Sequence, residues 1–436
     1  MQGSRRAAIF IAAGATRTDI QAHPKEQRAV LLAASTGDES WTVQESLAEL
    51  GMLAETAGVE VVGAETQKIR ASQRSSYLGR GKIQELKERK SSISFNTVIA
   101  DDELSPEQQR YLEGALEVQV LDRTALILHI FAEHARSREG KLQVELAQHR
   151  YRLPRLTGRG VELSRLGAGI NTRGPGETKL ESDRRRIRHR ITELNRDIEQ
   201  VRRQRALHRQ QRRSSGIPVV ALTGYTNAGK STLMNALTGA EVPSTDQLFV
   251  TLDPTTRRVT LPSGQEILLT DTVGFIQKLP SDLVAAFRAT MEEITEADVV
   301  LHVVDASSEQ VDEQAEAVED ELEALGVGNK PRITVLNKAD LVTAERMAVL
   351  TRHFEQPIVI SATAGNGLQA LEEWIAARVA EDFVPIRVEI PYAETSLVSL
   401  FRARGVVDRE EHRPAGTLIV GRLPPGLVSS FRAFTA

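Results

Sequence analysis

The stretch Gly224-Tyr-Thr-Asn-Ala-Gly-Lys-Ser231 decides the fold of this 436-residue chain. It fits the pattern GxxxxGK(S/T), and it follows the apolar run 218–222. A strand, a glycine-rich loop and a helix, in that order, are the context in which this pattern binds phosphate. The N–H groups of such a loop converge on phosphate oxygens at a helix N-terminus, where the helix dipole favours negative charge. We therefore expect a triphosphate site, with Lys230 reaching the β- and γ-phosphates and Ser231 holding Mg²⁺.

A second motif, Asn337-Lys-Ala-Asp340, follows an apolar strand and predicts which base is bound. A carboxylate at Asp340 can accept hydrogen bonds from N1–H and N2–H₂ of guanine, whereas adenine has no such pair of donors. A site built around hydrogen bonds rejects the analogue that lacks them. We expect Asn337 and the stem of Lys338 to brace the loop and flank the ring. Ser361-Ala-Thr363 follows strand 358–360 and suits a contact from backbone N–H to the O6 atom of guanine.

Two segments between these motifs are expected to respond to the γ-phosphate. Asp271-Thr-Val-Gly274 ends a strand, so that Asp271 would reach Mg²⁺ through water and the Gly274 N–H would contact the γ-phosphate. Phe249-Val-Thr-Leu-Asp253 fits a first switch, in which a threonine closes on Mg²⁺. Thr251 is the preferred candidate, and Thr255 and Thr256 remain alternatives.

The expected nucleotide site combines the phosphate loop, both switches and the two base-contacting loops. Its residues are Gly224, Tyr225, Thr226, Asn227, Ala228, Gly229, Lys230, Ser231, Thr232, Phe249, Val250, Thr251, Leu252, Asp253, Asp271, Thr272, Val273, Gly274, Asn337, Lys338, Asp340, Ser361, Ala362 and Thr363. Within this set, Lys230, Thr251 and Gly274 are the expected catalytic residues.

The order and spacing of these motifs are typical of a P-loop GTPase, an α/β fold with a mostly parallel sheet. The expected strands are 218–222, 258–261, 266–271, 299–305, 332–337 and 358–361, and the expected helices begin at Lys230, Asp282, Glu313, Thr343 and Leu368. Alternating strands and helices give a sheet covered on both faces. The ligand of such a sheet lies beyond the carboxyl ends of its strands, where every motif above occurs.

The chain divides into five predicted segments. They are a flexible N-terminal tail (1–27), a small α/β domain (28–140), a Gly-rich loop with a helical hairpin (141–215), the GTPase domain (216–381) and a small α/β C-terminal domain (382–436). In the second segment, Gly79-Arg-Gly-Lys82 is read as a turn that starts a helix. Asp101-Asp-Glu103 is read as a solvated loop end rather than a metal site.

Composition bounds the remaining classes of function. The chain has no cysteine, so it has neither disulfides nor a cysteine zinc site, which suits the cytoplasm. No apolar run is long enough for a membrane span. The formal net charge of −4 hides a local excess of arginine on the predicted helix of the hairpin.

That arginine excess indicates a polyanionic partner. Apolar residues from Leu180 to Val201 recur at heptad spacing, while arginines occupy the other faces and few acids oppose them. Aromatic residues are scarce here, which favours structured RNA bound through its backbone over single-strand stacking. The residues expected to contact RNA are Arg155, Arg159, Arg173, Arg184, Arg185, Arg186, Arg188, Arg202 and Arg203.

The chain resembles the HflX family of ribosome-associated GTPases. The resemblance rests on the phosphate loop, on Phe249-Val-Thr-Leu-Asp253, on Asp271-Thr-Val-Gly-Phe275, and above all on Arg173-Gly-Pro-Gly-Glu-Thr-Lys-Leu-Glu181. It implies binding to ribosomal RNA of the large subunit, and dissociation or rescue of stalled ribosomes. The alternative is a GTP-dependent assembly or docking factor without splitting activity. A third reading, an RNA-remodelling ATPase, conflicts with Asp340.

The resemblance also bears on catalysis and assembly. Many GTPases place a water-orienting glutamine where this chain has Phe275, so slow hydrolysis by the free protein and stimulation by ribosomes are expected. In relatives with an asparagine at the position of Asn227, that residue helps to hold K⁺, which makes Asn227 a candidate K⁺ ligand. The expected ligands are GTP and GDP with Mg²⁺, and the expected assembly is a monomer.

Overall fold

The computed structural model describes residues 27–35, 41–68, 76–156, 175–214, 216–239, 248–249, 251–279, 291–381 and 383–435. The chain forms two compact units. The first comprises Met1–Glu199 together with two short segments, Gln247–Phe249 and Lys278–Ala286. The second comprises Gln200–Asp246, Val250–Gln277 and Phe287–Ala436.

The first unit contains a four-stranded parallel sheet in the order β2-β1-β3-β4. Its strands are β1 (Arg28–Ser35), β2 (Glu60–Lys68), β3 (Thr97–Ala100) and β4 (Gln119–Asp122). Its helices are α1 (Val43–Thr56), α2 (Arg80–Ile93), α3 (Pro106–Leu116) and α4 (Arg123–His134). All four residues of β3 are buried, as expected for a strand with helices on both faces. The strand order reverses at β1, so the topological switch point lies between β1 and β3.

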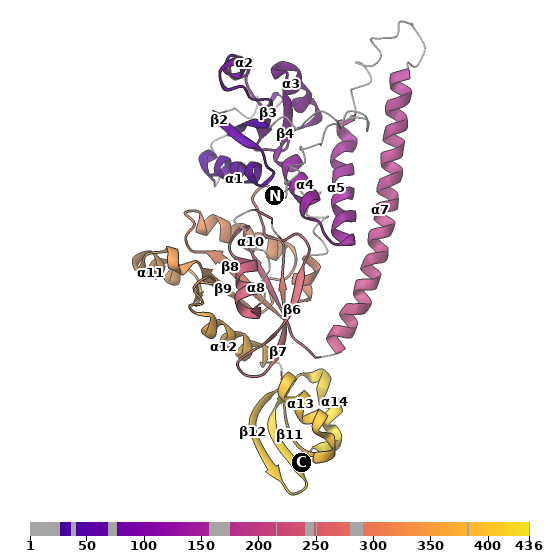
Figure 1. Ribbon diagram of the computed structural model, residues 1–436, viewed down its shortest axis with the longest axis vertical. Coiled ribbons are helices and arrows are strands. Elements are labelled where there is room, and N and C mark those ends of the chain that lie inside the picture. Colours follow the sequence, from indigo (N-terminus) through magenta and orange to yellow (C-terminus); the bar gives the residue numbers. More distant parts are fainter. Residues whose placement is uncertain are drawn as a thin grey trace, which may run out of the picture. The chain divides into compact units, whose positions relative to one another are not determined.

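Two long helices follow these elements in the chain. They are α5 (Arg138–Arg155) and α7 (Pro175–Ser214), which lie side by side in Figure 1. The second of them, α7, begins in the first unit and ends in the second. The Arg190 guanidinium on α7 donates to both carboxylate oxygens of Glu145 on α5, over 2.7 and 2.9 Å. Leu194 on α7 is fully buried, consistent with an apolar seam on this helix. The predicted helical pairing is therefore present over the described residues.

The second unit contains a six-stranded sheet in the order β10-β9-β8-β5-β7-β6. Its strands are β5 (Val219–Gly224), β6 (Thr255–Thr260), β7 (Glu266–Asp271), β8 (Val299–Asp305), β9 (Arg332–Asn337) and β10 (Ile358–Val359). Only β6 is antiparallel to its neighbour. Its helices include α8 (Lys230–Thr238), α10 (Val311–Ala324), α11 (Ala344–His353) and α12 (Leu368–Val379). The predicted α/β fold with a mostly parallel sheet is confirmed. The start of the helix expected from Asp282 lies outside the described residues, and residues 291–296 are helical.

The same unit ends in a three-stranded antiparallel sheet, β11-β13-β12. Its elements are β11 (Val384–Pro391), α13 (Thr395–Arg404), β12 (Val406–Arg413), β13 (Gly416–Leu423) and α14 (Pro425–Phe431). Figure 1 shows α13 and α14 beside this sheet. The rings of Phe401 on α13 and Phe431 on α14 meet edge to face. Strand β12 was not predicted, because the sequence Val406-Val-Asp-Arg-Glu-Glu-His-Arg413 is mostly charged and has no alternating apolar face.

Candidate functional site

The nucleotide motifs lie at the carboxyl ends of the parallel strands of the six-stranded sheet in the second unit. The phosphate loop follows β5, Asp271 ends β7, Asn337 ends β9, and Ser361 comes two residues after β10. Because these strands are parallel, their carboxyl ends meet at one edge of the sheet. The structure therefore brings together sequence motifs that lie more than a hundred residues apart.

The phosphate loop passes directly into α8, whose first residue is Lys230. Gly229, the residue before it, has φ 90°, and a Cβ atom there would lie 2.2 Å from Nδ2 of Asn337, so only glycine fits. The Lys230 ammonium is buried and donates to the carbonyls of Gly224 and Tyr225, over 3.1 and 2.7 Å. Burial lowers the pKa of Lys230 to about 8, although Asp271 opposes the shift.

Three oxygen-bearing side chains converge beside Lys230. The Ser231 hydroxyl lies 2.7 Å from Oδ2 of Asp271, the Thr251 hydroxyl lies 3.0 Å from the same atom, and the two hydroxyls are 2.9 Å apart. Burial raises the pKa of Asp271, while Lys230 and the two hydroxyls oppose the shift. Oδ1 of Asp271 is buried and has no hydrogen-bond partner within the described part of the chain. Hard oxygen ligands of this kind are those that Mg²⁺ prefers.

The position of Thr251 separates it from the two alternatives for the switch threonine. Thr255 and Thr256 are the first residues of β6 and pair with β7, and the Thr256 hydroxyl lies 3.0 Å from that of Thr270. Thr251 precedes the strand and faces Ser231 and Asp271 instead. This geometry favours Thr251. Of the other first-switch positions, Val250 lies outside the described residues, and Phe249 and Leu252 are buried.

Asn337 ties the phosphate loop to the expected guanine-O6 loop. Its Nδ2 donates to the carbonyl of Ala228 over 2.9 Å, and its Oδ1 accepts from the N–H of Ala362 over 3.0 Å. The Lys338 ammonium lies 2.7 Å from Oδ2 of Asp305, at the end of β8. Asp305 was not predicted as a site residue, although it is the last residue of the strand expected at 299–305 and the other site residues also follow strand ends. Asp340 is exposed in a short 3₁₀ turn, Ala339–Leu341.

The second switch, defined here as residues 271–277, is paired with the phosphate loop. The N–H of Phe275 donates to the carbonyl of Gly224 over 3.1 Å, and the N–H of Thr226 donates to the carbonyl of Phe275 over 2.7 Å. The N–H of Gln277 donates to the Tyr225 hydroxyl over 2.8 Å. Tyr225 was predicted only as part of the loop, and this hydroxyl contact was not foreseen. The Phe275 side chain is buried, so it presents no polar group to a reacting water.

The predicted RNA-contacting arginines differ in their surroundings. Arg185, Arg186, Arg188 and Arg203 are exposed on α7, and Arg184 is partly exposed. Arg202 pairs with Glu292 over 2.8 Å. Arg159 and Arg173 lie outside the described residues. Arg155 differs from the prediction, because its guanidinium stacks on the Tyr151 ring and bonds to Asp122 and to the carbonyl of Leu104. The Arg155 guanidinium is therefore engaged in contacts within the first unit and does not belong with the exposed arginines of α7.

The acidic run after β3 also differs from the sequence-based reading. Asp101 is buried, not solvated, and its carboxylate accepts from Arg123 over 2.8 Å and from the Ser46 hydroxyl over 2.6 Å. Within the described ranges, no group of three or more His, Cys, Asp or Glu side chains is placed to hold a metal ion. Among the helices that the structure describes, none is long and apolar enough to cross a bilayer.

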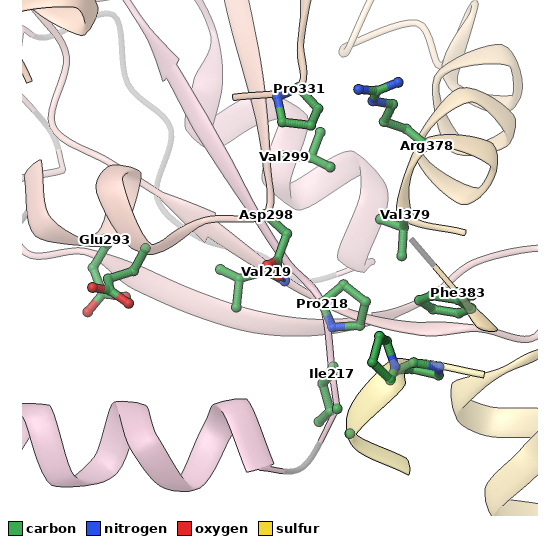
Figure 2. Close-up of a pocket in the computed structure, with 15 residues that line it drawn as sticks. Ile217, Pro218, Val219, Glu293, Asp298, Val299, Pro331, Arg378, Val379 and Phe383 are labelled. Carbon is green, nitrogen blue, oxygen red and sulfur yellow. Dashed lines mark hydrogen bonds between the residues drawn. The ribbon is translucent and has the colours of Figure 1, made fainter. Parts of the chain in front are cut away.

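A pocket of about 340 Å³ lies at the opposite edge of the second unit's large sheet (Figure 2). Its walls include Pro218, Val299 and Pro331, which stand before or at the start of β5, β8 and β9. Phe383 and Pro424 contribute from the C-terminal part of the chain. Since the nucleotide motifs follow the ends of these same strands, this pocket is separate from the nucleotide site.

Three family models match consecutive parts of the chain. They are described as GTP-binding GTPase N-terminal (residues 44–132), GTP-binding GTPase Middle Region (134–212) and 50S ribosome-binding GTPase (219–338). A crystallised GTP-binding protein from Sulfolobus solfataricus, in complex with GDP, is 26% identical with a TM-score of 0.42, covering 81% of this chain and 98% of that one.

Curated relatives match over most of their length. The GTPase HflX of Caldanaerobacter subterraneus is 47% identical over 409 residues, which is 94% of each chain. The GTPase HflX of Escherichia coli is 42% identical over 368 residues, covering 84% of this chain and 86% of that relative. With identities of this size over nearly the whole length of both chains, this chain belongs to the HflX family of GTPases.

Proposed function

We propose that this GTPase binds the large ribosomal subunit and dissociates or rescues stalled ribosomes, with an affinity that GTP controls. The observation that carries the proposal is the row of exposed arginines on α7, including Arg185, Arg186 and Arg188. Guanidinium groups suit the phosphates of structured RNA. The match of residues 219–338 to a family described as 50S ribosome-binding GTPase supports the same partner.

We further propose that GTP binds with Mg²⁺. Ser231 and Thr251 would hold the ion directly, and Asp271 would hold it through water, using the buried oxygen that has no other partner in the described structure. Bound Mg²⁺ supplies positive charge to the β- and γ-phosphates. Lys230 adds its own ammonium to the same phosphates, and the Gly274 N–H stabilises the γ-phosphate during its transfer to water.

Hydrolysis by the free protein is expected to be slow, because Phe275 is buried where many GTPases place a water-orienting glutamine. The large subunit would order the switches and complete the site. Turnover should therefore rise strongly when large subunits are added to the pure protein. Equal rates with and without large subunits would contradict this part of the proposal.

A K⁺ ion at the phosphate loop is a separate proposal. Asn227 is exposed and has φ 59°, in the left-handed region, at the position where K⁺-using relatives have asparagine. Replacing Na⁺ by K⁺ at constant ionic strength should raise the hydrolysis rate, and Asn227→Ala should remove the difference. Equal rates in the two salts would exclude a K⁺ site here.

Sedimentation of ribosomes separates the two candidate functions. With a non-hydrolysable GTP analogue, a splitting factor converts 70S particles to subunits, whereas a docking or assembly factor moves with the large subunit and leaves 70S particles intact. GDP serves as the control nucleotide. An unchanged profile with the protein bound would favour the docking factor, and the absence of any cosedimentation would overturn both.

A further inference from the structure

The pocket at the amino ends of β5, β8 and β9 is a cavity that the nucleotide chemistry does not use (Figure 2). All of its described walls belong to the second unit. Its volume of about 340 Å³ lies at the small end of the range in which proteins hold organic ligands. Val299, Val379 and Phe383 are buried and form apolar walls. The pocket therefore has the size and the surface of a site for a small molecule.

Several walls of this pocket are rigid before any ligand binds. Gly216 at the start of the lining has φ 65°, and a Cβ atom there would lie 3.1 Å from Cγ of Leu427 on α14. The turn into β5 is thus packed closely against the C-terminal part of the chain. Four further lining residues are prolines, whose rings fix the backbone angle φ: Pro218, Pro331, Pro424 and Pro425. A site that is already formed loses little conformational entropy when a ligand enters.

Much of the backbone around the pocket is already hydrogen-bonded. Asp298 accepts from the N–H of Val219 over 2.7 Å, and its own N–H donates to the Val219 carbonyl over 2.8 Å. The carbonyls of Pro218, Pro331 and Pro424 accept from N–H groups elsewhere in the second unit, over 2.8 to 2.9 Å. The prolines themselves have no N–H group to donate. The choice between polar ligands therefore depends on the side chains of the lining.

The polar side chains of the lining are mainly acidic. Glu293, Glu296 and Asp298 carry carboxylates, and Arg378 on α12 carries the one cationic group among the described lining residues. The Arg378 guanidinium is paired with Glu381, three residues later in the chain. Three carboxylates and one paired guanidinium give the pocket a potential that attracts cations and repels anions.

We propose that this pocket binds a small organic amine in its protonated form. The apolar body of the amine lies against Val299, Val379 and Phe383, and its ammonium group lies beside the carboxylates of Glu296 and Asp298. Burial of the apolar body supplies affinity, and the charge of the ammonium group supplies selectivity. The site lies outside the nucleotide motifs, so the proposal does not depend on the ribosomal function proposed above.

The test uses three probes with one body and three different ends. They are 4-phenylbutylamine, which is cationic, 4-phenylbutanol, which is neutral, and 4-phenylbutyrate, which is anionic. Binding is followed by the methyl resonance of Ile217, a lining residue, in NMR spectra of the full chain labelled at its isoleucine methyl groups. Ile217→Val identifies this resonance. Ile127, which is buried in α4 of the first unit, serves as the reference resonance and should not shift.

The amine should shift the Ile217 resonance in a saturable way, with a dissociation constant on the order of millimolar or below for a probe of this size. It should bind about tenfold more tightly than the alcohol, because its charge strengthens the hydrogen bonds to carboxylates. The butyrate should bind more weakly than the alcohol, because its charge is repelled.

Variants of the lining test the charges separately. Glu296→Gln combined with Asp298→Asn should weaken amine binding about fivefold and leave alcohol binding unchanged. An amide oxygen at position 298 can still accept from the Val219 N–H, so the backbone contact is retained. Arg378→Gln should act in the opposite direction and tighten amine binding about threefold, which a loss of folded protein cannot do. Asp320→Asn on α10 is the control, because it removes an exposed carboxylate outside the lining.

The possible outcomes separate the site from the class of ligand. Equal affinities for the amine and the alcohol, or tighter binding of the butyrate, would overturn the cationic ligand. No saturable shift of the Ile217 resonance with any of the three probes would overturn the site itself. An amine preference that survives the combined change at Glu296 and Asp298 would show that the ammonium group binds elsewhere, which would also overturn the proposal.

Discussion

Asn337 shows how one side chain can link two functions of a site. Its amide donates to the phosphate loop and accepts from the loop that follows β10, so phosphate and base contacts share a single brace. The amide is buried, and each bond to a buried group is costly to leave unmade. Nucleotide affinity therefore depends on a residue that need not contact the phosphates.

Base selection at the residue scale is tested by Asp340→Asn. The substitution removes the carboxylate that would accept from guanine N1–H and N2–H₂, so GDP affinity should fall by at least about a hundredfold, as expected when a site loses its hydrogen-bonding partner. Xanthosine diphosphate, which has an acceptor in place of the 2-amino group, should bind better than GDP. Competition binding with the two nucleotides measures this change. Asp312→Asn on α10 removes an equivalent charge and should alter neither affinity.

Lys230 predicts a pH dependence of nucleotide binding. With a pKa of about 8 in the free protein, its ammonium is lost progressively as the pH rises through this value. A bound polyphosphate favours the charged form and raises that pKa, so binding should take up a proton above pH 8, and affinity should decrease there as the pH rises further. Calorimetry in buffers of different ionisation enthalpy detects the uptake. No proton uptake between about pH 8 and 9 would contradict the depressed pKa.

The depressed pKa of Lys230 also determines how the stability of the free protein changes with pH. Because the pKa of Lys230 is lower in the folded than in the unfolded protein, the unfolded state binds more protons between about 8 and the ordinary lysine value. The contribution of Lys230 to the free energy of unfolding therefore increases as the pH rises across that interval, which stabilises the folded protein. Nucleotide affinity and the stability of the free protein should thus change in opposite directions there.

At the scale of elements, α7 is the main candidate for RNA binding. Simultaneous replacement of Arg185, Arg186 and Arg188 by glutamine removes three exposed cations from one part of the helix. If each contacts a phosphate, the slope of log affinity for large subunits against log salt should become less steep by up to about 3. GDP affinity should remain unchanged, and Arg352→Gln on α11 provides a control outside α7. An unaltered salt slope would exclude this part of α7 from the RNA surface.

The sequence predicted those elements that carry a strong local pattern. The strands of the large sheet and the starts of α8 and α12 follow from apolar runs and from motif positions, and the structure agrees. Strand β12 was missed, because its pairing with β13 comes from tertiary context and not from an apolar alternation. The burial of Asp101 was missed for a related reason. Nothing within four residues of it in the sequence indicates that Arg123, Ser46 and Lys278 converge on its carboxylate.

At the scale of the whole molecule, the core of the GTPase sheet extends into the C-terminal part of the chain. Phe383 is buried in the same apolar cluster as Val220, Leu301 and Ile375, and Val406 packs against that cluster. Residues beyond 381 therefore contribute to the stability of the sheet that carries the nucleotide site.

Phe383→Ala tests this contribution. Deleting a buried phenylalanine ring should lower the free energy of unfolding by about 3 kcal/mol. Trp374 packs against the same cluster, so its fluorescence during denaturant unfolding reports the change, with Trp41 replaced by phenylalanine. Phe434→Ala is the control, because Phe434 packs in a separate cluster within the terminal sheet. If the denaturant unfolding transitions of Phe383→Ala and the wild type were the same, the Phe383 ring would not stabilise the large sheet.

The pocket in Figure 2 has a consequence for inhibitor discovery. Phosphate loops are shared by many enzymes, so compounds that imitate the natural ligand rarely discriminate between them. The walls contributed by Phe383, Pro424 and Pro425 lie outside the matched stretch 219–338. A small molecule bound in this pocket would leave the phosphate loop at the other end of β5 free. GTP would therefore not compete with it, so its potency should not decline at high cellular concentrations of GTP.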